Sequence, residues 1–508
     1  MKTKFFLLIS LIFSIHFCFS QIMESEFRPC IGGDTAGMGI SNYRLLSAKS
    51  ADGSTWIKTN IVLSDRSSVS DGIILPSGRI LIYYVAGCEI VNDNEQMTNS
   101  IKVAVSDDNG ESWIYRNVLF DFVPIGGTLP VDPNVIILPD GTINMLVTID
   151  PDMSGQDKPC TYSAISEDGG FTFEIQGQVF AISGQELLDP ENFRLNDSIW
   201  YLWTGGIPGM NRLGVSIDDG LSFIDQGNFC SDTTANPSQC YVTADILKYV
   251  DTIYKMYAFG DVGGGIDGIV SLTSADCADW TLDSVILELT TPSNIENSRV
   301  WAPTVIKLPD STFLMVYETV IPSNWSDTLN LLTVLPNDTL ISIGDTLKFT
   351  TLGSYTDDTK RDLTSFATWN SSDPSVATID NIGRLVAVGT GTAKITAEDN
   401  GIISDSITVT VSETTGLTLD QKDELIILNV YPNPTKDYTK IKYQLLNNVN
   451  NGEIIFYNTF GREVKRLKVS NASDYLIIST YDLPAGTYYY RLRTGKGLSN
   501  SKKMMVIK

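Results

Sequence analysis

Hydrophobic residues in the first 324 positions occur in short runs that are separated by Gly, Pro, Asp and Asn. Two such runs joined by a tight turn recur five times, and VDPNVIILPDGTINMLVTI (131–149) shows the unit as strand, Pro-Asp-Gly turn and strand. The other four units begin at Val69, Leu188, Thr243 and Trp301. Runs of this length with turn residues between them are typical of strands. The pattern therefore predicts an all-β fold.

A second pattern alternates with these strand pairs. SDDNGESW (106–113), SEDGGFTF (166–173) and SIDDGLSF (216–223) share Ser, Asp, Gly and an aromatic residue at one spacing, and shorter forms begin at Ser50 and Ser274. Asp side chains bond nearby backbone N–H groups and Gly supplies a positive φ, so each motif predicts a hairpin turn with a structural Asp. The motif resembles the Asp-box, or BNR repeat, of sialidases and other secreted β-propellers, which implies a propeller here.

The order of these units suggests how the propeller closes. The first motif precedes the first strand pair, and no motif follows the last pair. If the strands within 42–60 complete the blade that begins at Trp301, the ring closes and leaves only short edges. We predict five four-stranded blades over residues 21–324, with six blades as the alternative.

Two smaller β modules are predicted to follow. Residues 331–412 alternate short Thr-, Val- and Ile-rich strands with turns, as a β-sandwich does. Their segments WNSSDPSVATID and GRLVAVGTGTAKITA resemble the bacterial Ig-like domain of group 2, which implies a spacer or an adhesion module. A polar linker, 413–426, leads to a small β-sandwich at 427–508. Its segments VYPNPTKDYTKIKY and LPAGTYYYRLRTG resemble the C-terminal sorting domain of the type IX secretion pathway of Bacteroidetes, which implies an export address and the secretion machinery as a partner.

The N-terminus also predicts export. Lys2 and Lys4 precede an apolar run and small residues, the pattern of a signal peptide over residues 1–20. No later apolar run reaches the roughly 18 residues that a membrane-spanning helix needs. We expect a protein that does not span the membrane and that passes through the periplasm to the cell surface or the medium.

Composition excludes several kinds of chemistry. The net charge is −24, although residues 427–508 hold 13 Lys and Arg against 5 Asp and Glu. So acidic a body makes nucleic acid an unfavourable partner. The single histidine, His16, lies in the signal peptide, which excludes histidine-based triads, acid–base catalysis and zinc sites from the mature chain. Six cysteines remain and favour disulfides; only Cys230 with Cys240 is suggested by closeness in sequence.

Carboxylates are therefore the candidate chemistry. The first strand of each predicted pair is expected to be the innermost strand of its blade, next to the central channel. When these five inner strands are aligned on their turns, one column of the alignment holds Val69, Asp132, Asp189, Thr243 and Ala302. Two residues later, on the same strand face, lie Asp71, Asn134, Glu191, Asp245 and Thr304. Acids that converge on one axis push their pKa values apart, as glycoside hydrolysis by two carboxylates requires. The alternative is that Asp-Pro only begins a strand.

This arrangement resembles the five-bladed glycosidases that act on furanosides and related glycans. The resemblance implies Asp71 as base, Asp132 as modulator and Glu191 as acid, although Asp71 lies in Ser-Asp-Gly and not in an Asp-Pro pair. Further side chains are predicted to bind substrate: Asp189, Asp245, Arg299 and Trp301.

A calcium site is a separate hypothesis, with a solvated loop as its alternative. Asp150, Asp152 and Ser154 place oxygen atoms at alternate positions, as the start of a calcium loop does, but no Glu follows at the twelfth position. No other cofactor is predicted.

The leading functional hypothesis is an exported glycoside hydrolase with a glycan or polysaccharide as its partner. Two alternatives stay open, a non-catalytic glycan-binding or adhesion protein and an exo-sialidase. A sialidase needs an arginine triad, whereas the candidates here are scattered along the chain: Arg28, Arg66, Arg194, Arg212 and Arg299.

Overall fold

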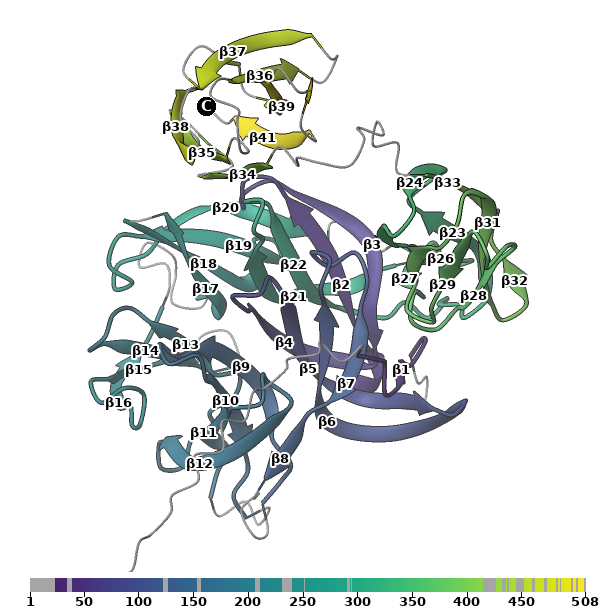
Figure 1. The fold of residues 1–508 in the computed structure, drawn as a ribbon. Helices are drawn as coiled ribbons and strands as arrows, with labels where there is room; N and C mark the ends of the chain where they lie inside the picture. Colours follow the sequence, from purple (N-terminus) through teal and green to yellow (C-terminus); the bar gives the residue numbers. More distant parts are fainter. Residues whose placement is uncertain are drawn as a thin grey trace, which may run out of the picture. The chain divides into compact units, whose positions relative to one another are not determined.

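A computed structural model gives the architecture (Figure 1), and it describes residues 23–33, 39–121, 127–152, 157–205, 211–230, 240–250, 252–289, 293 and 295–413, and most of 426–506. The predicted signal peptide and almost all of the predicted linker lie outside the described residues. The chain divides into two compact units, Met1–Glu413 and Thr414–Lys508. Apart from one 3-10 helix, Gly39–Asn42, the regular elements of the described residues are strands.

Four blades of the propeller are consecutive in the chain. Each is an antiparallel sheet of four strands in sequence order, to which β1 (Arg28–Pro29) and β8 (Leu119–Asp121) add at edges. Their strands are β4 (Ser67–Ile74), β5 (Ile80–Val91), β6 (Asn94–Ser106) and β7 (Ile114–Asn117); β9 (Val131–Ile137), β10 (Ile143–Ile149), β11 (Cys160–Ser166) and β12 (Thr172–Phe180); β13 (Glu191–Arg194), β14 (Trp200–Thr204), β15 (Arg212–Ser216) and β16 (Ile224–Asn228); and β17 (Val242–Val250), β18 (Ile253–Asp261), β19 (Asp267–Ser274) and β20 (Thr281–Glu288).

The fifth blade joins the two ends of the propeller. It runs in the order β21 (Asn297–Lys307), β22 (Phe313–Val320), β2 (Tyr43–Ser50) and β3 (Trp56–Asp65). β2 pairs with β22 from Tyr43↔Val320 to Ser50↔Phe313. The innermost strands β4, β9, β13, β17 and β21 are neighbours in this order around one axis (Figure 1). The predicted five-bladed ring, closed by the N-terminal strands, is confirmed.

The repeated Ser-x-Asp motif forms the same turn in all five blades. A serine hydroxyl donates to the Asp two residues later at 2.6 to 3.0 Å in the pairs Ser50–Asp52, Ser106–Asp108, Ser166–Asp168, Ser216–Asp218 and Ser274–Asp276. The Asp then accepts backbone N–H groups, and those of Thr55 and Ser54 lower the pKa of Asp52 to about 2. The motif's aromatic residues are buried: Trp56, Trp113, Phe173, Phe223 and Trp280. The predicted structural role of this Asp is confirmed.

The Ig-like region is continuous with the fifth blade. β23 (Leu329–Leu335), β26 (Thr350–Tyr355) and β27 (Lys360–Asp362) extend that sheet, because β27 pairs in parallel with β3 at Lys360↔Ile61. The remaining strands form two small sheets: β24 (Thr339–Ser342), β33 (Ile407–Ser412), β31 (Gly391–Asp399), β32 (Ile402–Ile403) and β28 (Thr368–Ser371); and β25 (Thr346–Lys348), β30 (Arg384–Ala387) and β29 (Ala377–Ile379).

A buried ion network crosses this junction. The Asp65 carboxylate accepts hydrogen bonds from Arg44 Nε at 2.8 Å and from Arg361 Nη2 at 2.6 Å. It also accepts a hydrogen bond from the backbone N–H of Gly32 at 2.5 Å. The side chains of Arg44 and Asp65 are completely buried. Because Arg361 belongs to the Ig-like domain, this domain supplies a cation that pairs with a buried carboxylate of the propeller. The domain therefore does more than act as the spacer that the sequence resemblance implies.

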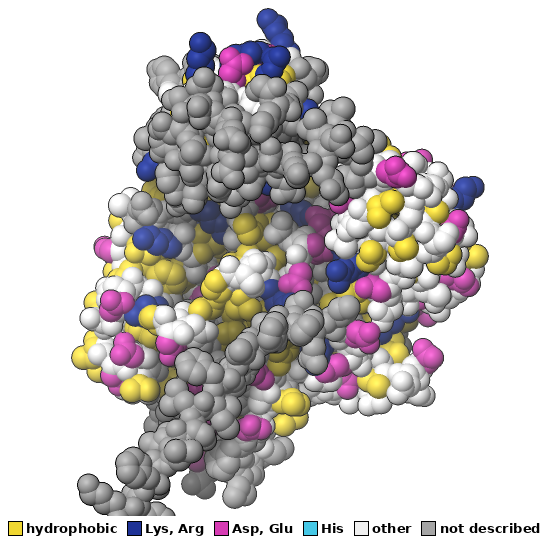
Figure 2. Space-filling view, in the orientation of Figure 1, with side chains coloured by type: hydrophobic (Ala, Val, Ile, Leu, Met, Phe, Trp, Pro, Cys, Tyr) yellow, Lys and Arg dark blue, Asp and Glu magenta, His cyan; other side chains and the backbone are white. Residues whose placement is uncertain are grey.

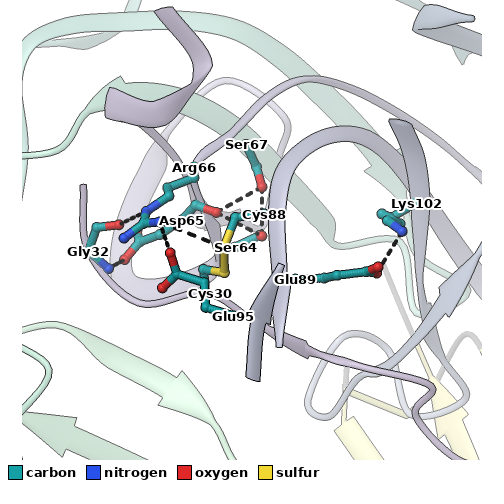
Figure 3. The surroundings of a disulfide bond; sticks show 10 residues. All are labelled: Cys30, Gly32, Ser64, Asp65, Arg66, Ser67, Cys88, Glu89, Glu95 and Lys102. Atoms are coloured by element: carbon teal, nitrogen blue, oxygen red, sulfur yellow. Dashed lines mark hydrogen bonds and ion pairs between the residues drawn. A yellow bond between two sulfur atoms is a disulfide. The ribbon is translucent and has the colours of Figure 1, made fainter. Parts of the chain in front are cut away.

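Two disulfides lie in the first unit. Cys230–Cys240 is the pair that sequence closeness suggests, and it is confirmed. Cys30–Cys88 joins the segment around β1 to β5, next to the Asp65–Gly32 and Arg66–Gly32 hydrogen bonds (Figure 3). The other two cysteines of the described chain, Cys160 and Cys277, are free and buried.

The C-terminal unit is a two-sheet sandwich. One sheet holds β34 (Ile426–Tyr431), β35 (Tyr438–Gln444) and β38 (Ser473–Ser479); the other holds β37 (Glu463–Val469), β36 (Gly452–Asn458), β39 (Gly486–Thr494), β40 (Gly497–Leu498) and β41 (Lys502–Val506). Its core includes Ile441, Phe456, Tyr490 and Met504. Lys and Arg side chains dominate its described surface in Figure 2, in line with the positive charge of this part of the sequence.

Candidate functional site

The inner strands are irregular at the first aligned column. Four residues of that column have positive φ values of 40 to 50°: Val69, Asp132, Asp189 and Ala302. We call these the bulge residues. The pairing register shifts beside this column in β4, β9, β17 and β21. Bulges re-aim side chains and recur next to active sites, and a non-glycine residue keeps such a backbone only where its surroundings hold it. The backbone irregularity therefore singles out the end of the channel where the bulge residues lie. We call this end the channel mouth.

The second column forms a closed hydrogen-bonded ring. In four blades a side-chain oxygen accepts a backbone N–H from the inner strand of the next blade: Asp71 from Val135 (2.6 Å), Asn134 from Asn192 (2.9 Å), Glu191 from Ile246 (3.1 Å) and Asp245 from Val305. Thr304 completes the circle because its hydroxyl donates to the Ser70 carbonyl. We call these five residues the closure ring. Their side chains pair with backbone N–H and C=O groups on the inner-strand edges, where no further strand is available to form hydrogen bonds.

The acids of the closure ring share a second set of contacts. Asn134 Nδ2 donates to Asp71 Oδ2 at 3.0 Å and to Glu191 Oε2 at 2.8 Å. Burial raises the pKa of Asp71 to about 7 although these hydrogen bonds lower it. Burial, with the charges of Asp71 and Asp245, also raises the pKa of Glu191 well above its usual range. Asp71, Glu191 and Asp245 thus line the channel, but each has at least one carboxylate oxygen engaged in joining blades.

The two bulge acids are differently placed. Asp132 and Asp189 are partly exposed at the channel mouth, and the Asp189 N–H lies 3.5 Å from Asp132 Oδ2. Burial raises the pKa of Asp132. Burial together with the charges of Asp132 and Glu318 raises the pKa of Asp189 well above its usual range. The pKa values of both aspartates are therefore raised, that of Asp189 more strongly.

Two cavities lie on either side of the closure ring. The one at the channel mouth measures about 30 Å³, room for one or two water molecules. It is lined by residues that include Val69, Asp71, Asp189, Glu191, Thr243, Phe259 and Ala302. The other measures about 340 Å³ and is lined mainly by the apolar second halves of the inner strands, with Arg194 and Lys307. The closure ring therefore separates the bulge acids from the larger cavity.

A cation and two aromatic rings lie close to the channel mouth. The Arg299 guanidinium lies 4.1 Å from the ring centre of Trp301, and its Nη1 donates to the Tyr43 hydroxyl at 2.8 Å. The Trp301 and Phe259 ring centres are 5.4 Å apart. The charge of Arg299 also reaches Glu318 and lowers the pKa of that carboxyl, which burial raises.

Glu318 is an acid that sequence reasoning missed. It lies on β22 and not on an inner strand, so the turn alignment passed over it. Its side chain is buried, and its charge raises the pKa of Asp189. One signal was available, since Glu318 is the single ionisable carboxylate within the apolar run FLMVYETV.

The other candidate residues do not join this site. Four of the five candidate arginines form ion pairs of their own: Arg28–Asp399, Arg66–Glu95, Arg194–Asp197 and Arg212–Asp225. No arginine triad therefore forms among the described residues of the channel mouth. For calcium, the Asp152 N–H donates to Asp150 at 3.3 Å, and Ser154 lies outside the described residues. Within the described chain, neither Asp belongs to a group of three acidic or cysteine ligands.

Comparisons with known families identify both C-terminal modules. A model of the secretion system C-terminal sorting domain matches residues 429–508, and a model of the bacterial Ig-like domain (group 2) matches residues 331–411. Both resemblances are confirmed, and the sorting domain marks the chain for export to the cell surface or the medium. Among the described residues there is no helix with the length and apolar character needed to cross a membrane. Neither match includes the propeller, so its Asp-box resemblance stays a prediction.

The remaining relatives are partial or distant. Ice-binding protein 1 of Shewanella frigidimarina is 36% identical over 114 residues, which are 22% of this chain and only 12% of that protein. Three solved structures are similar at low identity. An α-L-arabinofuranosidase from Clostridium thermocellum has 12% identity, covers 67% of this chain and 93% of its own, and gives a TM-score of 0.34. A β-xylosidase/α-arabinofuranosidase from a compost metagenome has 16% identity, covers 51% of this chain and 93% of its own, and gives a TM-score of 0.37. A Dyadobacter fermentans protein of unknown function has 16% identity, covers 55% of this chain and 84% of its own, and gives a TM-score of 0.38.

Proposed function

We propose that this exported protein is a glycoside hydrolase whose acid–base pair is Asp132 and Asp189. One observation carries the proposal: two partly exposed aspartates occupy strained backbone positions on neighbouring blades at the channel mouth, and the backbone N–H of Asp189 donates to Asp132 Oδ2. Glycoside hydrolysis needs one carboxylic acid and one carboxylate in such a place. The proposal moves the chemistry away from Asp71 and Glu191, because the closure ring already engages both.

The two acids take different roles because their environments differ. Asp189, whose pKa is raised well above its usual range, is the acid of the pair and donates its proton to the departing glycosidic oxygen. Asp132 acts as the carboxylate, either by removing a proton from the attacking water or by attacking the sugar carbon itself. The mouth cavity of about 30 Å³, which Asp189 lines, has room for one or two water molecules beside the proposed acid.

Binding would come from the groups beside the acids. Trp301 is partly exposed and offers an aromatic surface against which a sugar ring packs, with the buried ring of Phe259 behind it. Arg299 is held over Trp301 and offers donors to sugar oxygens. Asp245, an expected substrate contact, is engaged with the Val305 N–H in the closure ring. We therefore assign it a structural role in this proposal.

The test is hydrolysis of a panel of neutral and acidic glycans by the full mature chain. Asp132→Asn and Asp189→Asn should each lower the rate by about 10²–10⁴-fold with little change in melting temperature. The matched controls are Asp71→Asn and Glu191→Gln, which alter the closure ring and should therefore change the melting temperature more than the rate. Full activity in both bulge variants would refute the assignment.

Glycan binding without cleavage is the second candidate. The small size of the mouth cavity favours it, since about 30 Å³ does not enclose a sugar ring. A glycan array distinguishes the two functions. If some glycans bind and none is cleaved, the protein is a binding or adhesion module. The scattered arginines give an exo-sialidase no comparable support.

A further inference from the structure

Glu318 is a buried acid whose partners lie on another blade. It belongs to β22, where its backbone is opposite Trp301 on one side and Leu45 on the other. Its side chain is only 4% exposed. A carboxyl is unfavourable in such surroundings unless it is hydrogen-bonded, so its partners indicate its role.

The two hydrogen-bond donors to Glu318 lie at the first bulge. Ser68 Oγ donates to Glu318 Oε2 at 2.5 Å, and the Val69 N–H donates to the same oxygen at 3.3 Å. Val69 has a φ of 40°, which is rare for a β-branched residue, and the register of β4 shifts between Ser68 and Ser70. The carboxylate of the fifth blade therefore holds the strained backbone of the first blade at the point where the ring closes.

Glu318 also faces the charges of the channel mouth. Its charge adds to that of Asp132 in raising the pKa of Asp189, and Asp132 in turn raises the pKa of Glu318. Arg299 of β21 is the opposing cation. Three carboxyls from three blades thus share one region with one guanidinium.

We propose that Glu318 is a positioning residue of the channel mouth, which holds the Ser68–Val69 bulge and adds a third carboxylate beside Asp132 and Asp189. It acts through these residues and not on the substrate. The proposal deepens the proposed function and rests on it for its catalytic consequence. Its structural part, the coupling between Glu318 and Asp189, is measurable without any substrate.

Two substitutions separate the hydrogen bonds from the charge. Glu318→Gln keeps an oxygen that accepts from Ser68 and Val69 but removes the charge. It should leave kcat near its maximum while the alkaline limb of the pH–rate profile moves down by about one pH unit. Glu318→Ala removes the hydrogen bonds as well, and the released bulge should lower kcat/KM by about 10- to 100-fold.

A stability measurement provides the readout that does not need activity. A pKa raised in the folded state makes stability fall as pH rises between the unfolded and folded values. Glu318→Gln should therefore reduce the fall in melting temperature between pH 5 and pH 8. The change should be larger when Asp189 is present than in the Asp189→Asn background, because part of it is the coupling of the two groups. A purely structural Glu318 would give the same change in both backgrounds.

The matched control is Glu296→Gln. Glu296 is also a buried glutamate of the fifth-blade region, but its partners are Lys58 and Tyr317. It should show no coupling to Asp189→Asn. Equal effects of Glu318→Gln in both Asp189 backgrounds, or an unchanged pH–rate profile, would overturn the proposal. If no variant or wild type cleaves a glycan, the proposed function fails while the stability cycle still decides the coupling.

Discussion

Replacing Arg361 by methionine tests whether the Ig-like domain stabilises the propeller. Arg361 lies on β27 and its Nη2 is 2.6 Å from Asp65 Oδ2, across 296 positions of sequence. Asp65 is completely buried, so the variant leaves this carboxylate with Arg44 and the Gly32 N–H alone. Removing one partner of a buried pair costs about 3–5 kcal/mol. Because Arg44 remains, we expect a loss near 3 kcal/mol.

The pH dependence gives this prediction a second measure. Burial raises the pKa of Asp65, but the charges of Arg361 and Arg44 lower it to about 2. A folded-state pKa below the unfolded value of about 3.9 stabilises the fold above pH 4, and this stabilisation is lost as the pH falls toward 2. Without Arg361 the pKa of Asp65 rises. The variant should therefore unfold at a higher pH than wild type during acid titration.

Calorimetry and tryptophan fluorescence on the full mature chain provide the assay. The control is Arg79→Met, because Arg79 forms an exposed pair with Asp107 at 2.8 Å. An exposed pair contributes about 0–1 kcal/mol, so this variant should melt close to wild type. If Arg361→Met melts within one degree of Arg79→Met, the junction is not coupled energetically. If only an Ig-like transition moves, the domain does not stabilise the propeller.

The remaining predictions concern the closure ring and export. In wild type, the raised pKa of Asp71, about 7, makes stability fall between pH 4 and pH 8. Asp71→Asn removes this titration and should reduce the fall by up to about 4 kcal/mol. Melting temperatures across that pH range provide the measurement, and a pH dependence equal to that of wild type would contradict the prediction. Deletion of residues 427–508 should leave the first unit folded but held in the periplasm, because the sorting domain is the export address. Fractionation of expressing cells tests this, and surface delivery of the truncated chain would rule it out.

The sequence determined the features that depend on neighbouring residues. The Ser-x-Asp turns follow from side chains within five positions of one another, and the strand pairs follow from short apolar runs with turn residues between them. The count of these units was enough to predict five blades and closure by the N-terminal strands. The matched families of both C-terminal modules also followed from local segments.

Tertiary structure alone decided how each channel acid is placed. The alignment placed Asp71, Asp132, Asp189 and Glu191 on one axis, but it could not distinguish a carboxylate bonded to the next blade from one that is partly exposed. That distinction depends on the register shifts in four of the five inner strands, which determine where successive side chains point.

Glu318 and Arg361 were beyond local reasoning for the same reason. Glu318 meets Val69 across 249 positions, and Arg361 meets Asp65 across 296. Neither contact leaves a periodic signal, because each depends on how separately formed sheets pack. Local patterns determined the strands and the order of the blades, whereas long-range packing determined burial, and with it which carboxyls have raised pKa values.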